Sequence, residues 1–362
     1  MMVKVISGVK SINSVTLPLK MPKRINTSVS VKSTDLTVNK YLLHHPVSAV
    51  SGDYEAWPNI DKFADGTFIT AYRTTTNQSA HYYASTGRVA VKKSTDGITW
   101  GAEIVVIDNV DIDDRNVGIL VFDNNGVETV LICYNTYDDV TCRVFVIKSI
   151  DKGETWGTPI PIAEGVFRAT VTNPILLSTG DIAFNAYFHD AFCEISSDGG
   201  DTWTEYQISD HTALGHNEVN ETAIIEIKTD GEYTGGMLAI GRTTASEPYV
   251  YERFKSADYG HTWASDGTET GVPVCRSKPN LYRLDVDTIL YAGTDYDNAN
   301  LILYVSKDEG ETWTGGYIVV SGLSTSYYPG IVLHNNDMYI VWCKNSAWAN
   351  VYCSIVPRSA VA

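Results

Sequence analysis

Five copies of one short motif, Ser-x-Asp-(x)-Gly-x-Thr-Trp, recur along this chain of 362 residues. The copies begin at Ser94, Ser149, Ser196, Ser256 and Ser306, and they are spaced by roughly fifty residues. Repeats of this length are typical of propellers and solenoids, in which each unit buries its apolar face only by packing against its neighbours. The repeat therefore favours a radial or solenoid array over a fold without internal symmetry.

The residue types of the motif, which we call an Asp box, are those of a tight turn. Ser and Asp side chains accept hydrogen bonds from backbone N–H groups a few residues further on. Glycine supplies a backbone position with positive φ, and tryptophan buries a large ring between sheets. We therefore interpret the boxes as structural turns that hold one repeat against the next, and we expect no chemistry from them.

Six repeats can be aligned from about residue 45 onward, each with an apolar strand, a turn and a second apolar strand. The first strands begin at the aligned positions Trp57, Asn116, Asn173, Glu221, Lys278 and Tyr328. The sixth repeat, 328–356, has no box, and we expect segment 41–50 to supply its outer strand, which would close the ring and protect the sheet edges. The sequence thus predicts an all-β fold, a six-bladed β-propeller over 41–362 with five Asp boxes.

Residues 1–40 have a different composition, because their charged side chains are basic except for Asp35. No Asp box lies there, and short alternating stretches indicate strands. We expect a short N-terminal β-rich arm or small β module that docks on the propeller, on a second copy of the chain or on a larger assembly.

Strand order predicts where function lies. The second strand of a blade ends on the side of the disc where the first began, and the box, which follows the third strand, lies on the opposite side. We therefore expect binding residues at the starts of first strands and the ends of second strands. Loops at one end of a rigid β scaffold are the usual place for binding.

Charge and composition exclude several classes of partner. Asp and Glu number 43 against 27 Lys and Arg, a net charge of −16, which argues against nucleic acid and against an anionic membrane surface. No apolar stretch is long enough to span a membrane, and we predict no metal site and no cofactor. The N-terminus lacks the apolar core of a signal peptide, so we expect cytoplasmic expression or association with a virus particle.

The boxes and their spacing resemble those of the sialidase-like superfamily of β-propellers. In that superfamily a tyrosine and a glutamate form the nucleophilic pair, and arginines hold the substrate. Asn220-Glu221-Thr-Ala-Ile-Ile and Gly241-Arg242-Thr in the fourth blade are similar to the segments that carry the glutamate and one arginine. Tyr327-Tyr328-Pro-Gly in the sixth blade is similar to the nucleophile segment. The resemblance implies a retaining glycosidase in which Tyr328 is the nucleophile and Glu221 its base.

The chain also departs from the sialidase pattern. Ala56-Trp57-Pro58 stands where an Arg-Ile-Pro is expected, Asn298 stands at the place of a third arginine, and no first-blade acid is evident. Asp114 is our candidate for the catalytic acid, with Asp113 or His81 as alternatives. We expect the substrate to be bound by a set of rim residues, Arg242, Arg115, Arg73, Trp57, His81, Asn173 and Lys278.

Two functions follow from these observations. The first is a glycoside hydrolase that acts on a glycan, with sialic acid as only one of the candidate substrates. The alternative is a non-catalytic protein that binds a glycan or receptor within a virus particle, such as a phage tail or fibre. The missing acid, the missing arginine and the arm at 1–40 favour this alternative, in which the arm would mediate a homo-oligomer or a larger assembly.

Overall fold

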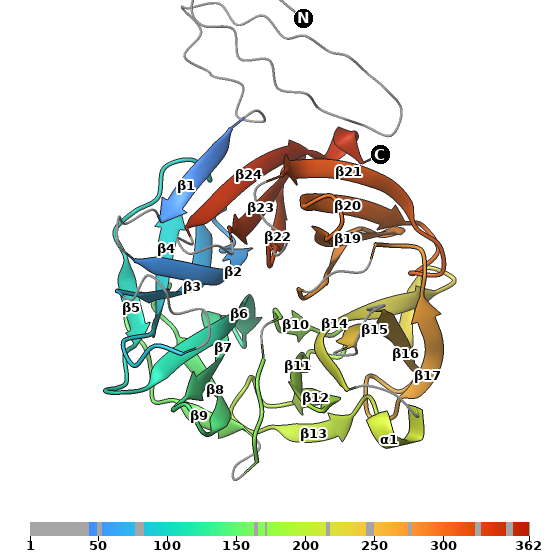
Figure 1. Ribbon diagram of the computed structural model, residues 1–362, viewed down its shortest axis with the longest axis horizontal. Helices are drawn as coiled ribbons and strands as arrows, with labels where there is room; N and C mark the ends of the chain where they lie inside the picture. Colours follow the sequence, from blue (N-terminus) through green and yellow to red (C-terminus); the bar gives the residue numbers. More distant parts are fainter. Residues whose placement is uncertain are drawn as a thin grey trace, which may run out of the picture.

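A computed structural model describes residues 43–48, 53–76, 83–162, 166–170, 172–214, 218–243, 250–273, 277–322, 327–344 and 350–361. Within them the chain forms six sheets of four antiparallel strands each, arranged around a central axis (Figure 1). The predicted six-bladed β-propeller is therefore confirmed. The arm predicted at 1–40 lies outside the described residues.

Each blade is a meander whose first strand lies nearest the axis. The first blade consists of β2 (Tyr54–Lys62), β3 (Phe68–Thr75), β4 (Arg88–Ser94) and β5 (Ile104–Ile107). The second consists of β6 (Asp113–Asn124), β7 (Val127–Tyr137), β8 (Cys142–Ser149) and β9 (Ile160–Ile162). The third consists of β10 (Ile175–Leu176), β11 (Ile182–Phe188), β12 (Asp190–Ser196) and β13 (Thr204–Gln207). The fourth blade consists of β14 (Val219–Thr229), β15 (Glu232–Thr243), β16 (Tyr251–Ser256) and β17 (Ala264–Glu269). The fifth consists of β18 (Asn280–Asp285), β19 (Thr288–Asp295), β20 (Asn300–Ser306) and β21 (Thr314–Ser321). The sixth consists of β22 (Gly330–His334), β23 (Asp337–Cys343), β24 (Val351–Pro357) and β1 (His44–Ser48).

The ring is closed by strands from the two ends of the propeller. β1 pairs antiparallel with β24, with His45 opposite Cys353, as expected for segment 41–50. The pairing gives the sixth blade its outer strand and removes an exposed edge, which would otherwise offer unpaired backbone groups. Helix is confined, within the described ranges, to α1 (His211–Leu214) and a 3₁₀ turn at Arg358–Ala360, and neither is long or apolar enough to cross a membrane.

The hydrophobic core lies between neighbouring blades. One cluster, for example, joins Phe68 and Tyr72 of the first blade to Tyr339 and Val341 of the sixth. Strand residues that face the adjacent sheet are fully buried, and this burial, at about 25 cal/mol per Å² of apolar surface, is the main favourable contribution to folding. The blades therefore form one continuous core, which holds the rim residues in place.

The Asp boxes form the predicted turns at the ends of the third strands. In the second copy, Gly153 N–H donates to Ser149 Oγ at 2.9 Å, and Thr155 N–H donates to Asp151 Oδ1 at 2.9 Å. The box glycines also lie against the preceding blade; a Cβ on Gly97 would come within 2.4 Å of the Tyr339 ring. Since consecutive strands are antiparallel, the boxes lie on one rim of the disc, the Asp-box rim, and the predicted binding residues belong to the other, the site rim.

Candidate active site

Tyr328 and Glu221 meet at the site rim, although 107 residues separate them in the chain. Tyr328 lies two residues before β22, and Glu221 lies near the start of β14. The Tyr328 hydroxyl donates a hydrogen bond of 3.0 Å to Glu221 Oε1. Both residues are buried, with 7% and 5% of their surface exposed. The predicted pairing of the two side chains is therefore confirmed.

The surroundings keep the Tyr328 hydroxyl protonated. Burial raises its pKa well above the ordinary value, and the negative charge of Glu221 raises the pKa further, whereas Arg242 acts in the opposite direction. Arg242 Nε lies 3.0 Å from Glu221 Oε2, in an ion pair whose angle falls outside hydrogen-bond geometry. A carboxylate bonded to a protonated phenol is the arrangement that a tyrosine nucleophile needs, since the carboxylate can accept the phenol proton as the oxygen attacks.

The backbone at the aligned rim positions is strained in three blades. Trp57, Asn116 and Tyr328 have φ values of 52°, 52° and 48°, in the left-handed region that bulky side chains rarely adopt. β2 and β6 each have an irregular register around this position. Strained residues of this kind persist only where the surrounding structure holds them, and they are common at functional sites. The observation supports the alignment of these positions and makes this rim the candidate site.

A buried network of arginines and an aspartate lies beside Tyr328. Arg73 donates to both oxygens of Asp113, at 2.7 and 2.8 Å, and both side chains have 0% exposure. Arg115 NH1 lies 3.5 Å from Asp113 Oδ2, and its guanidinium lies 4.5 Å from the centre of the Trp57 ring. The Trp57 ring in turn makes an edge contact with Tyr328, with 6.3 Å between ring centres.

This network corrects two predicted contacts with substrate. Arg73 is completely buried and bound to Asp113, so it supports the rim from below. Trp57 is 3% exposed and packs against Arg115 and Tyr328, so its ring has no free face on which a sugar could stack. Arg115 and Arg242 keep 14% and 18% of their side chains exposed and stay candidates for binding substrate.

The prediction that Asp114 is the catalytic acid is also corrected. Successive side chains of a strand point to opposite faces, and Asp114 faces away from the arginine network around Asp113. Its two oxygens accept hydrogen bonds from the Asn109 backbone N–H at 2.7 Å and from Asn109 Nδ2 at 2.8 Å. Burial raises the pKa of Asp114 to about 6, but the side chain has 0% exposure. The structure therefore gives it a role in holding the Asn109 turn.

Lys278 and Asn173 lie deeper than predicted. The Lys278 ammonium is buried and donates to Asn59 Oδ1 at 2.8 Å. Asn173 accepts from Ile119 N–H at 3.0 Å and lines a cavity of about 350 Å³ along the axis. That cavity also contains Arg283, which binds Glu309 of the fifth Asp box at 2.7 Å. Both predicted binding residues thus connect one blade to another, and the buried Lys278 amine lies close enough to Glu221 for its pKa to respond to the Glu221 charge.

The buried amine of Lys278 predicts a pH dependence of stability. Burial lowers its pKa to about 7, although Glu221 raises it in part. Between about pH 7 and 10.5 the unfolded chain binds the proton and the folded chain does not, so this group makes the protein more stable as the pH rises through that range. We expect Lys278→Met to remove this gain, measured as the change in Tm between pH 7 and pH 10. An unchanged gain in the variant would contradict the assignment.

The sequence did not reveal an aromatic row at the site rim. Phe167 and Phe188 have ring centres 4.3 Å apart, and His189 lies 4.0 Å from Phe188. Phe188 is 38% exposed, and the His189 carbonyl accepts from Val219 N–H at 2.9 Å, two residues before Glu221. The row combines residues at the end of β11 with a residue from the segment before β10. These residues form no local sequence motif, so the sequence alone does not predict the row. His81, a predicted binding residue, lies outside the described residues.

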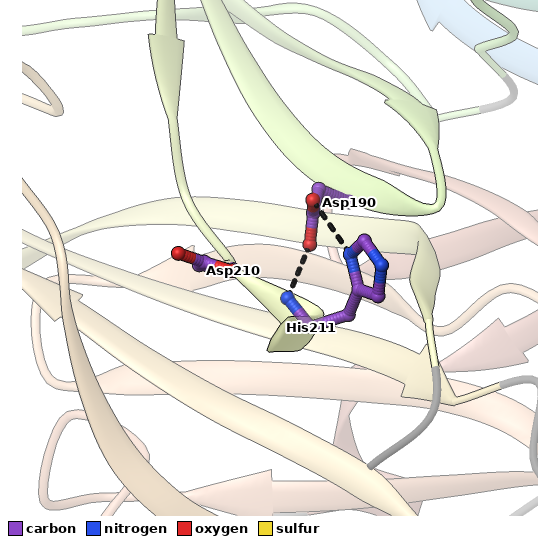
Figure 2. A group of neighbouring side chains, drawn as sticks. All are labelled: Asp190, Asp210 and His211. Carbon is purple, nitrogen blue, oxygen red and sulfur yellow. Dashed lines mark hydrogen bonds and ion pairs between the residues drawn. The ribbon is translucent and has the colours of Figure 1, made fainter. Parts of the chain in front are cut away.

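Figure 2 shows the group of side chains, among the described residues, whose oxygens and nitrogen lie close enough to share a metal ion, Asp190, Asp210 and His211. Asp190 accepts from the His211 backbone N–H at 2.7 Å and is 2.9 Å from His211 Nδ1. Asp210 Oδ1 accepts from the N–H groups of Thr212 and Ala213, at 3.0 and 3.1 Å. These contacts cap the start of α1 and account for the positions of all three side chains.

Comparisons with known proteins agree with the fold. Residues 66–340 match a family model described as a BNR repeat-like domain. A protein of unknown function from Dyadobacter fermentans aligns with a TM-score of 0.73 and 16% identity, covering 87% of this chain and 97% of that one. The Hadza microbial sialidase Hz136 aligns with a TM-score of 0.71 and 16% identity, over 88% and 69% of the two chains.

A third solved structure, the NanB sialidase of Streptococcus pneumoniae, aligns with a TM-score of 0.69 and 13% identity, over 93% of this chain and 74% of that one. Identities this low establish similarity of fold alone. A search of curated proteins finds no match.

Proposed function

This chain belongs to the BNR repeat-like family and has a sialidase-like propeller, and from this premise we propose that it is a retaining glycoside hydrolase acting on a glycan at the site rim. The observation that carries the proposal is the buried hydrogen bond from the Tyr328 hydroxyl to Glu221. A tyrosine bonded to a carboxylate, next to an arginine and at strained backbone, has the parts of an activated nucleophile.

In the proposed reaction Glu221 accepts the phenol proton while Tyr328 Oη bonds to the anomeric carbon. The bond from that carbon to the leaving oxygen breaks, and the leaving oxygen takes a proton from an acid. Asp113 and Asp114 are held by other groups, so His81 stays our candidate for that acid. Water then attacks the same carbon, gives a proton to the conjugate base of that acid and displaces the tyrosine, which recovers its proton from Glu221. Two displacements retain the anomeric configuration.

The test is a screen of fluorogenic glycosides followed by ¹H NMR of the first-formed anomer. We expect hydrolysis of at least one glycoside with retention of configuration. Inversion would exclude a tyrosine nucleophile, because a single displacement by water needs no covalent intermediate. Binding of glycans on an array without release of sugar from any of them would contradict the proposed hydrolysis.

The aromatic row gives a prediction about substrate length. A sugar ring stacked on Phe188 lies beyond the bond that is cleaved, so the contact is made equally in the bound substrate and in the transition state. We expect Phe188→Ala to raise KM about 5-fold for an oligosaccharide with kcat unchanged, and to leave a short aryl glycoside unaffected. The control is Ile150→Ala, which removes an apolar side chain of 74% exposure at the Asp-box rim. Equal effects of the two variants would exclude the row as a subsite.

The second candidate function is a non-catalytic glycan-binding protein of a virus particle. It is favoured by the observation that Arg73 and Asn109 hold the two aspartates predicted as acids. This function predicts glycan binding without turnover, and assembly through residues 1–40. Light scattering of the full chain and of a chain lacking 1–40 measures the second property. A monomer that hydrolyses glycosides would exclude it.

A further inference from the structure

A second cavity lies apart from Tyr328 and Glu221. It measures about 380 Å³ and extends along β20 and β21 of the fifth blade, from the turn between β19 and β20 to Tyr304 and Gly316. β20 and β21 provide its wall through Ile302 and Ile318, which are directly paired across the two strands. A volume of this size lies within the range of pockets for small organic ligands and is far larger than a metal ion needs.

One side chain in this cavity has a hydrogen-bonding atom that the protein leaves unused. Asn300 is 7% exposed, and within the described part of the chain its Oδ1 has no hydrogen-bond partner. A buried acceptor without a partner is unfavourable, and native proteins leave few such atoms. Asn300 lines the cavity, so its carboxamide is the polar group that a ligand in the cavity would contact.

The other lining groups define the chemistry of that ligand. Ile302, Ile318 and the Tyr304 ring form an apolar side, while Asp295 and Asn298 form a polar one. Asp295 disfavours an anion, and its carboxylate accepts hydrogen bonds from Asn298, at 3.3 Å from the backbone N–H and 2.7 Å from Nδ2. A single carboxylate already bonded in this way is a poor calcium site. A neutral sugar ring, with one apolar face and hydroxyl donors at its edge, fits both sides.

We propose that this cavity is a second carbohydrate-binding site, which takes a neutral sugar unit whose hydroxyl groups form hydrogen bonds with the Asn300 carboxamide. It is connected to the Tyr328 site through the turn between β19 and β20. The hydroxyl of Tyr327, the neighbour of Tyr328, donates to the Ala299 carbonyl at 2.9 Å, and Gly322 N–H donates to the same oxygen at 2.8 Å. The cavity would bind part of a branched or long glycan away from the bond that is cleaved. It would therefore help to hold the glycan on the protein and would take no part in the cleavage.

The test uses the full chain with Tyr328→Phe as background, so that hydrolysis does not consume the ligand. An array of neutral glycans identifies a bound member, and its affinity is then measured by calorimetry. Asn300→Leu, which removes the unused acceptor, and Ile318→Trp, which fills the cavity, are each expected to weaken binding at least tenfold. Asp297→Asn changes an exposed charge in the same turn and is expected to leave the affinity unchanged.

Stability provides a second readout for the same variant. Asn300→Leu replaces a buried amide, whose oxygen has no partner among the described residues, by an apolar side chain of similar size, so we expect its Tm to rise by roughly 2 °C while binding is lost. Loss of folding in this variant leaves Ile318→Trp as the decisive measurement.

Three results would overturn the proposal. They are the absence of any neutral glycan bound by the background protein, an affinity in both cavity variants equal to that of the background protein, and binding of calcium alone that Asn300→Leu abolishes. The outcome is independent of the hydrolase proposal, since a wild-type chain without hydrolytic activity can still show binding that depends on Asn300.

Discussion

Replacing Tyr328 with phenylalanine is expected to lower kcat by about 10⁴-fold while the fold stays intact. The variant keeps the ring and its edge contact with Trp57, but it lacks the oxygen that would bond to the anomeric carbon. Its other loss is one hydrogen bond to Glu221, which changes stability by only about 1 kcal/mol. The measurement is the hydrolysis rate on the best glycoside from the screen, together with Tm.

The chain offers a matched control at the next residue. Tyr327 is also buried, but its hydroxyl donates to the Ala299 carbonyl, so Tyr327→Phe removes one hydrogen bond without touching the nucleophile. We expect it to retain activity. Glu221→Gln keeps the shape of the base and removes its ability to accept a proton, with an expected loss of about 10²- to 10⁴-fold. Full activity in Tyr328→Phe would exclude the tyrosine mechanism whatever the other variants do.

Removal of the carboxylate from Asp113 is expected to destabilise the protein by about 3–5 kcal/mol. Asp113 and Arg73 are both completely buried and share two hydrogen bonds. In Asp113→Ala the guanidinium of Arg73 would stay in the interior without this partner, and a buried charge that loses its partner is among the costliest single changes in a protein. Urea unfolding followed by tryptophan fluorescence measures the difference.

Two controls separate burial from charge pairing. The double variant Arg73→Met with Asp113→Leu removes both fully buried charges and is expected to be far closer to wild type than Asp113→Ala alone, because neither member of that pair stays behind as an unpaired buried charge. Asp201→Ala breaks the ion pair of Lys148 with Asp201, whose side chain is 64% exposed, and is expected to cost at most about 1 kcal/mol. Similar losses of unfolding free energy from Asp113→Ala and Asp201→Ala would show that the buried ion pair contributes no more to stability than the exposed one.

The architecture was predictable because its determinants are local and repeated. A box such as Ser149-Ile-Asp-Lys-Gly-Glu-Thr-Trp makes its hydrogen bonds within its own few residues, so its conformation can be read from consecutive letters. Five boxes and a sixth repeat without one specify six blades. The need to complete the last sheet leads to β1, which pairs with β24 as expected.

The site was predictable only in part. The resemblance of two segments identified Tyr328 and Glu221, and the shared strand geometry of the blades explains why these aligned positions meet at one rim. The same alignment placed Trp57, Asn173 and Lys278 at rim positions, but it does not indicate how far each side chain is buried below the surface of the rim. Their side chains pack between blades or along the channel, so the expected contacts with substrate were wrong for these residues.

The sequence by itself determined the repeat, the number of blades and the identity of the tyrosine–glutamate pair that meets at one rim. The tertiary structure alone decided which polar side chains are already occupied. Arg73 is held by Asp113, 40 residues away, and Lys278 by Asn59, 219 residues away. The tertiary structure likewise shows that Asn300 Oδ1 has no hydrogen-bond partner among the residues that it describes. Whether a polar group is satisfied depends on neighbours brought together from distant blades, and no local pattern of residues records that.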